Sequence, residues 1–175
     1  MVTVVGSIDN AWKRDKSTFV HHLIFTSDSI LMFDLFDKKD VKKEVRSFLM
    51  SDPMTLIPGP TQNYAMMVET KKAYREITDQ AIYSGNRIEK DIDTEIARQP
   101  PEYKEIDYAG ISEIILKQGK HLHPPKLIIT STEGKIEYNL MHNSYEKKEY
   151  LDDETFNRYK DLVTEVLGEK ATIEG

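Results

Sequence analysis

The 175-residue sequence has no cysteine and only eight glycines. The lack of cysteine excludes a disulfide framework, thiolate ligands for zinc and a cysteine nucleophile. No apolar run reaches the roughly eighteen residues that a membrane-spanning helix needs, and the N-terminal segment lacks the apolar core of a secretory signal. We therefore expect a cytoplasmic protein.

Several familiar catalytic patterns are also missing. The sequence contains no GxSxG, P-loop, GxGxxG or HExxH motif. Its net charge of −6 argues weakly against a partner dominated by phosphate, such as nucleic acid or anionic lipid, and we expect no nucleic acid as a partner. We expect a non-catalytic module without a cofactor, whose partner is another protein or a second copy of the chain. A membrane surface is a less favoured alternative.

The N-terminal part has the period of β-strands. Residues 19–25 and 30–36 are rich in strand-forming side chains, and the polar residues 26–29 between them predict a turn. Both strands are apolar enough to be largely buried. Residues 2–5 are either another strand or a frayed end, because Gly6 and a polar segment follow them.

The period changes to that of a helix at Asp37. Apolar residues recur every three or four positions from Val41 to Leu49, with Asp37 as the predicted N-cap and an end near Pro53. A second helical pattern runs from Tyr64 through Ile96 until Pro100 and Pro101 end it. One unbroken helix of about 38 residues would span about 57 Å, longer than a compact domain of this size is wide. We therefore predict two helices with a break at residues 84–86.

Period-two segments return after Pro100 and Pro101. Four strands are predicted here, at residues 103–107, 111–117, 126–131 and 135–141. An amphipathic helix is predicted at residues 145–167, with Gly168 as its terminator. The strands should pair as an antiparallel meander closed by this helix.

Three stretches resemble the prokaryotic pleckstrin-homology-like (PH-like) families: FTSDSILMF, IDYAGISEIIL, and KLIITSTEGKIEYNL followed by an amphipathic helix. This resemblance implies an α+β fold in which a seven-stranded antiparallel β-barrel is capped by the C-terminal helix. Such domains bind protein, peptide or lipid, usually without catalysis. In one domain of residues 1–175, the barrel would comprise residues 1–36 and 102–175, and residues 37–101 would be a helical insertion.

The first inserted helix carries candidate binding residues on its polar side. They are basic and lie within nine positions: Lys38, Lys39, Lys42, Lys43 and Arg46. This side could meet an anionic lipid surface or nucleic acid. However, acidic residues are interleaved with the basic ones, which is typical of a solvated helix face. The short, acidic loop at residues 26–29 also counts against binding of a lipid headgroup.

The histidines are the candidate metal ligands. His121 and His123 flank one residue, so their side chains would point the same way in an extended segment. A third ligand would have to come from His142 or from the His21 and His22 pair. We predict that no structural metal binds, and a metal-dependent enzyme using the histidines remains the alternative. In their strand, one of His21 and His22 should point inward and the other outward.

We place function on the insertion, because a barrel does not need it for closure. Tyr64, Met66, Met67 and Tyr74 lie at one end of its apolar stripe, and methionine and tyrosine are common at adaptable contact surfaces. The alternative is that the whole stripe packs on the barrel of its own chain.

Overall fold

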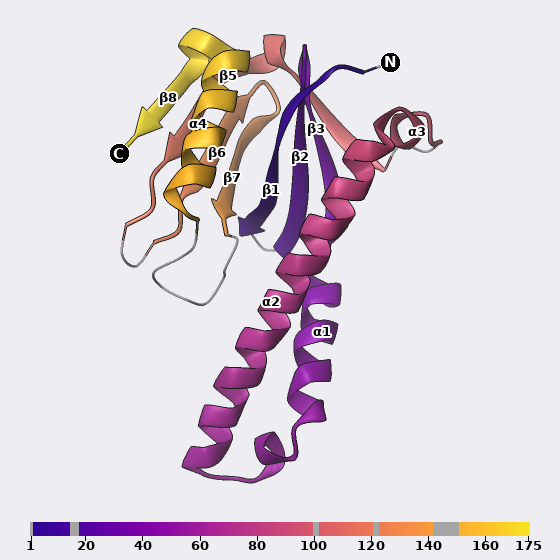
Figure 1. Ribbon diagram of the computed structural model, residues 1–175. Coiled ribbons are helices and arrows are strands. Elements are labelled where there is room, and N and C mark those ends of the chain that lie inside the picture. Colours follow the sequence, from indigo (N-terminus) through magenta and orange to yellow (C-terminus); the bar gives the residue numbers. More distant parts are fainter. Residues whose placement is uncertain (1, 15–17, 100–101, 121–122, 142–150) are drawn as a thin grey trace.

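The computed structural model describes residues 2–14, 18–99, 102–120, 123–141 and 151–175, and it has an α+β fold. One sheet carries helices on both faces, and two helices extend beyond it (Figure 1). Its eight strands are β1 (Val4–Arg14), β2 (Thr18–Thr26), β3 (Ser29–Phe36), β4 (Tyr103–Asp107), β5 (Ile111–Lys117), β6 (Lys126–Ser131), β7 (Gly134–Leu140) and β8 (Ala171–Glu174). The helices are α1 (Lys38–Ser51), α2 (Pro60–Lys90), α3 (Ile92–Ile96) and α4 (Asp153–Leu167), with a 3-10 turn η1 at Pro53–Leu56.

The strands form one sheet in the order β4-β3-β2-β1-β7-β6-β5-β8. Neighbours pair antiparallel except β5 and β8, which pair parallel. The predicted antiparallel meander forms from β5, β6 and β7, whereas β4, which was expected to belong to it, pairs with β3 at the other edge of the sheet. The sheet does not close into the expected barrel, because β8 pairs with the outer edge of β5. Among the described residues, β4 and β8 are the two edges.

The predicted strands between residues 19 and 141 all form, with ends within one residue of the prediction. Of the two alternatives for residues 2–5, the strand is correct in part, because β1 begins at Val4. Its continuation to Arg14 through the polar segment was not predicted. Its pairing with β2 is irregular between Ile8 and Ala11, and Asn10 there has a φ of 51°. This bulge accommodates polar residues inside a long strand. The short β8 was also missed.

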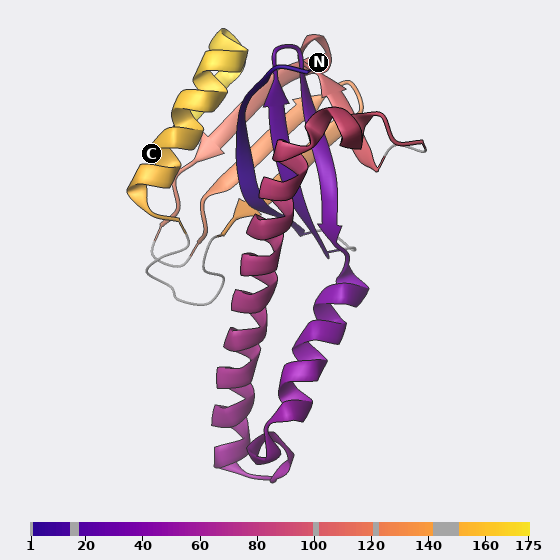
Figure 2. The ribbon, with the colours of Figure 1, turned by 45° about the vertical axis from the view of Figure 1, so that its right-hand side comes forward.

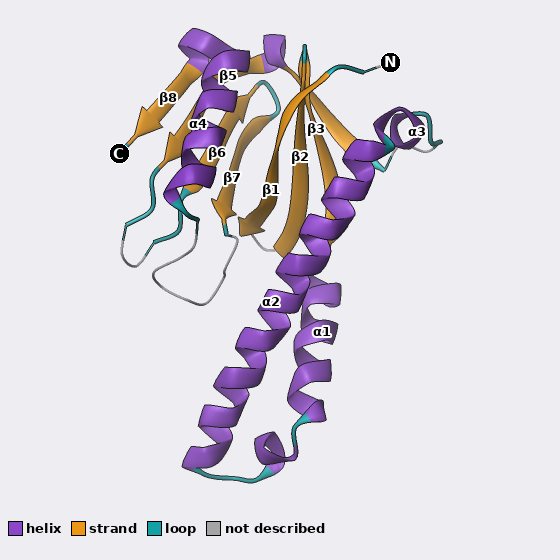
Figure 3. Cartoon of the chain, viewed as in Figure 1, coloured by secondary structure: helices purple, strands orange, loops and turns teal. Residues whose placement is uncertain are grey.

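The sheet is covered on both faces, which explains why its strands are so apolar. Figure 3 shows α4 beside one half of the sheet and α2 beside the other. One face packs against α4 through Phe156, Tyr159 and Val163. The other face packs against α2 and α3 in two clusters, which include Ile77, Ala81, Ile88 and Ile92. Helix α4 thus covers the sheet as predicted. The predicted helix begins in residues 145–150, which lie outside the described residues.

Helix α2 is one continuous element of 31 residues, so the predicted break at residues 84–86 was wrong. Gly85 lets α2 approach β2 closely, because a Cβ built on it would lie 2.5 Å from Nδ1 of His22. At the standard rise the helix is about 46 Å long. It fits because its N-terminal half extends beyond the sheet beside α1 (Figure 2). The chain instead changes direction at Asp91.

The helices α1, α2 and α3 connect two strands, β3 and β4, that pair directly with each other. Asp37 caps α1 in a capping box with Asp40, as its position predicts. The inserted helices therefore interrupt a β-hairpin.

Within the described residues, no helix is both long enough and apolar enough to cross a membrane.

Candidate functional site

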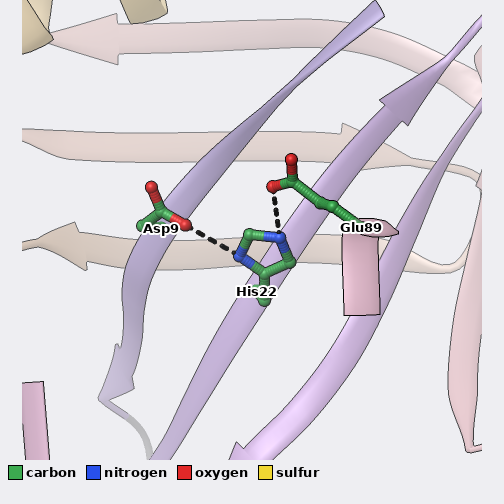
Figure 4. Close-up of side chains that lie close together, drawn as sticks. All are labelled: Asp9, His22 and Glu89. Atoms are coloured by element: carbon green, nitrogen blue, oxygen red, sulfur yellow. Dashed lines mark ion pairs between the residues drawn. The ribbon is translucent and has the colours of Figure 1, made fainter. Parts of the chain in front are cut away.

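A buried ionic cluster lies where α2 crosses the sheet. Its centre is His22 of β2, which is fully buried. Nδ1 of His22 lies 3.0 Å from Oδ1 of Asp9, and Nε2 lies 2.8 Å from Oε1 of Glu89. Figure 4 shows the imidazole ring with one carboxylate beside each nitrogen. The cluster links β1, β2 and α2.

The local structure of each element positions these side chains. Asp9 lies in the bulge of β1, and its backbone N–H donates to the hydroxyl of Tyr159 on α4 over 3.2 Å. Arg158 of α4 also approaches the other carboxylate oxygen of Asp9, with 3.8 Å between Nη2 and Oδ2. Glu89 is one turn beyond Gly85, whose missing side chain lets α2 approach the ring. The helices on both faces are thereby joined to the cluster.

The cluster favours a charged imidazole. Burial by itself lowers the pKa of His22, but hydrogen bonds and charges from Asp9 and Glu89 outweigh it, so the pKa is raised. The hydrogen bond from His22 is the main cause that lowers the pKa of Glu89, against the opposing effect of burial. An imidazolium between two carboxylates therefore fits this site.

A metal ion fits the same residues less well. Asp9, His22 and Glu89 each offer one ligand atom, and these atoms lie within 4.8 Å of one another. However, the two short contacts involve different ring nitrogens. Zinc ligands lie about 2.0–2.2 Å from the ion, so an ion on either nitrogen would be close to only one of the carboxylates unless the other moved. A proton on the imidazole balances one carboxylate without any such movement.

A groove of about 830 Å³ runs beside the cluster, between β1 and α4. Glu89 lines it with a side chain that is 29% exposed, together with Ser7, Arg158 and Asp161. His22 has no exposed surface, so it cannot reach a molecule in this groove. The lowered pKa of Glu89 also makes that carboxyl a poor proton donor at neutral pH. The cluster is therefore better suited to holding elements together than to acid–base catalysis.

The paired histidines of β2 reach different faces of the sheet. His21 and His22 point to opposite faces, as predicted, because His21 packs on Tyr138 on the α4 face and His22 meets Gly85 of α2. Neither is exposed, since α2 covers the face that His22 reaches. His21 lies 3.0 Å from Asp34 and packs edge-on against Tyr138. His123 is exposed, whereas His121 and His142 lie outside the described residues.

The second feature is the free end of the α1 and α2 pair, residues 42–72, which we call the distal hairpin. All of these residues are described, and only Thr55, Ala65 and Glu69 among them are buried. Eleven large apolar residues are half-buried or exposed: Val45, Phe48, Leu49, Met50, Met54, Leu56, Ile57, Tyr64, Met66, Met67 and Val68. Seven of these are at least 39% exposed. The distal hairpin has no core of its own.

The candidate interaction residues divide between two places. Tyr64, Met66 and Met67 are exposed near the tip of the distal hairpin. Tyr74 instead packs against Trp12 of β1, with 5.7 Å between the ring centroids. The apolar stripe on α2 is thus partly an anchor on the sheet and partly free surface.

The candidate basic residues lie on α1, between the sheet and the tip. Lys39, Lys42, Lys43 and Arg46 are exposed, and Lys38 is the first residue of the helix.

Comparison of the chain with models of known families and with curated proteins found no match. Function must therefore be argued from the distal hairpin and the ionic cluster.

Proposed function

We propose that this chain is a cytoplasmic protein-interaction module that presents its distal hairpin to a protein partner. The observation that carries this proposal is that residues 42–72 contain eleven large apolar residues, none of which is buried. Contiguous exposed apolar patches of more than a few hundred Å² usually mark interaction sites. The hairpin lies far from the sheet, where a partner can reach it (Figure 2).

The energetics favour a partner. Helices in proteins owe most of their stability to the packing of an apolar face, and isolated helices as short as α1 are marginal in water. Complete burial of a large apolar side chain contributes about 1.5–3 kcal/mol. A partner that covers the distal hairpin would therefore stabilise both of its helices.

The chemistry of the tip favours protein over membrane. Residues 47–70 contain no lysine or arginine, and their only charged residues are Asp52 and Glu69. Peripheral helices that bind anionic membranes usually place basic residues around the inserted apolar side chains. Methionine supplies four and tyrosine one of the seven exposed large apolar residues of the tip, and both residue types are enriched in protein interfaces. The basic residues of α1 lie nearer the sheet.

In this proposal the sheet acts as a rigid support. Helix α2 is continuous from the ionic cluster at Glu89 to the tip, so the sheet fixes the direction of the distal hairpin. We also propose that the sheet and α4 are a variant of the PH-like fold. The order of strands followed by a C-terminal helix supports this, whereas the open sheet departs from the expected barrel.

A pair of charge-matched variants tests the proposal. Leu56→Asp combined with Met67→Asp places two charges on exposed tip residues, and Tyr83→Asp combined with Asn86→Asp places two on exposed positions of α2 over the sheet. We expect the tip variant alone to lose capture of a stoichiometric protein partner from an extract of the source organism, with an unchanged circular dichroism spectrum. Quantitative mass spectrometry of the three captures measures this.

Two results argue against the proposal. One is equal capture of the same partner by the wild type and the tip variant. The other is flotation of the wild type with phosphatidylserine-containing vesicles that the tip variant loses, because the hairpin would then serve a membrane.

A further inference from the structure

We propose that the occupant of the distal hairpin is a second copy of this chain. Two hairpins would pack side by side and antiparallel in a two-fold symmetric dimer, with the two sheets at opposite ends. This inference rests on the proposed function, because it identifies the partner for the same surface.

The exposed area matches what a dimer requires. Seven large apolar side chains of the distal hairpin are 39% to 66% exposed. At about 200 Å² per side chain, with about half of it exposed, they offer roughly 700 Å². A stable interface of standard size buries about 800 Å² on each partner. The exposed side chains of one hairpin therefore nearly suffice for one side of a dimer.

The architecture of the hairpin favours an identical partner. Val45, Phe48 and Leu49 on the inner side of α1 are only half-buried, because α2 covers them from one direction. A second pair of helices would cover them from another direction and complete a four-helix arrangement. Two-fold symmetry lets the same open surface serve both copies, and it is the commonest symmetry of soluble oligomers.

The charges determine the orientation. Residues 38–46 of α1 carry five basic and two acidic side chains, a net charge of +3, whereas Asp52 is the only charged residue among residues 50–67. Parallel hairpins would place the two basic segments against each other. In the antiparallel arrangement, the two basic segments lie apart from each other, so this repulsion is avoided.

Sedimentation equilibrium of the full chain tests the dimer. The expected mass is twice the monomer mass of 20.3 kDa for the wild type. We expect Leu56→Asp combined with Met67→Asp to raise the dissociation constant at least about 100-fold, because two charges would replace two of the exposed apolar side chains that the interface would bury. The combined Tyr83→Asp and Asn86→Asp control should remain dimeric. The inference is wrong if the wild type stays monomeric at its highest soluble concentration, or if the tip variant dimerises as well as the control.

The absence of cysteine allows the orientation to be tested separately. Lys43→Cys near the sheet and Thr61→Cys near the tip, both at exposed positions, are treated with a short flexible bismaleimide. We expect efficient crosslinking only when the two variants are mixed, and crosslinking of each variant with itself would overturn the antiparallel arrangement. A monomeric wild type that still captures a different protein through its tip would refute the dimer and leave the proposed function intact.

Discussion

Replacement of His22 by leucine is expected to lower the free energy of unfolding by about 3 kcal/mol, at the lower end of the range for breaking a buried ion pair. The substitution keeps a side chain of similar volume but leaves the carboxylates of Asp9 and Glu89 without the imidazolium between them. The lower end applies because Glu89 is partly exposed and water can solvate it. For a chain of this size, the melting temperature should fall by about 6–12 °C.

The neighbouring histidine supplies the control. His21→Leu should cost less than His22→Leu, because the side chain of Asp34, the partner of His21, is half-exposed to water. Adding Asp9→Asn and Glu89→Gln to His22→Leu should recover part of the lost stability, since no unpaired carboxylate then remains. Equal costs for both histidines, or no recovery, would contradict the ionic account.

The pH dependence of unfolding checks the same cluster. The pKa of His22 is raised above 6.5, so its contribution is complete below pH 6.5 and is lost as the pH rises through the raised folded value. The pKa of Glu89 is lowered below 4.5, so its contribution is complete above pH 4.5 and is lost as the pH falls through the lowered value. The difference between wild type and His22→Leu should therefore be largest between about pH 4.5 and 6.5.

Gly85→Leu should have a similar or larger effect. Any Cβ at this position would lie 2.5 Å from Nδ1 of His22, and that buried ring is fixed by its two carboxylates. Helix α2 would have to move away from the sheet, and we expect a loss of about 3 kcal/mol in chemical denaturation, at the upper end of typical overpacking costs.

Asn86→Leu, at the next and exposed position, is the matched control. Glycine is about 0.8–1 kcal/mol less favourable than alanine in a helix interior, and leucine ranks just below alanine, so helix propensity alone predicts that Gly85→Leu stabilises the chain. A stabilised Gly85→Leu variant would show that α2 does not approach His22 this closely.

The sequence predicts most of the regular structure, because period and turn residues are local signals. The strands from β2 to β7 and the cap of α1 at Asp37 were identified in this way. Two errors came from tertiary context. Gly85 was interpreted as a helix break, although it serves a contact with a distant strand, and the polar residues of β1 concealed a strand whose bulge accommodates them.

The candidate site was predicted only in part. The exposed tip residues Tyr64 and Met67 were named from their residue types, whereas Tyr74 packs on the sheet because the stripe on α2 serves both purposes. The carboxylates of Asp9 and Glu89 could not be connected to His22, since they are separated in sequence and meet only after α2 docks on the sheet. A histidine in an apolar strand was the one signal available.

The central claim is that the distal hairpin lacks a core and needs a partner, although it shares the helix α2 with the core of the sheet. Amide hydrogen exchange of the dilute wild-type chain tests this most directly, because residues 60–72 and 77–90 belong to one helix. We predict that amides of residues 60–72 exchange at least about 100-fold faster than those of residues 77–90, and that protection increases with protein concentration. Uniformly slow exchange along the whole of α2 in the dilute chain would contradict the account.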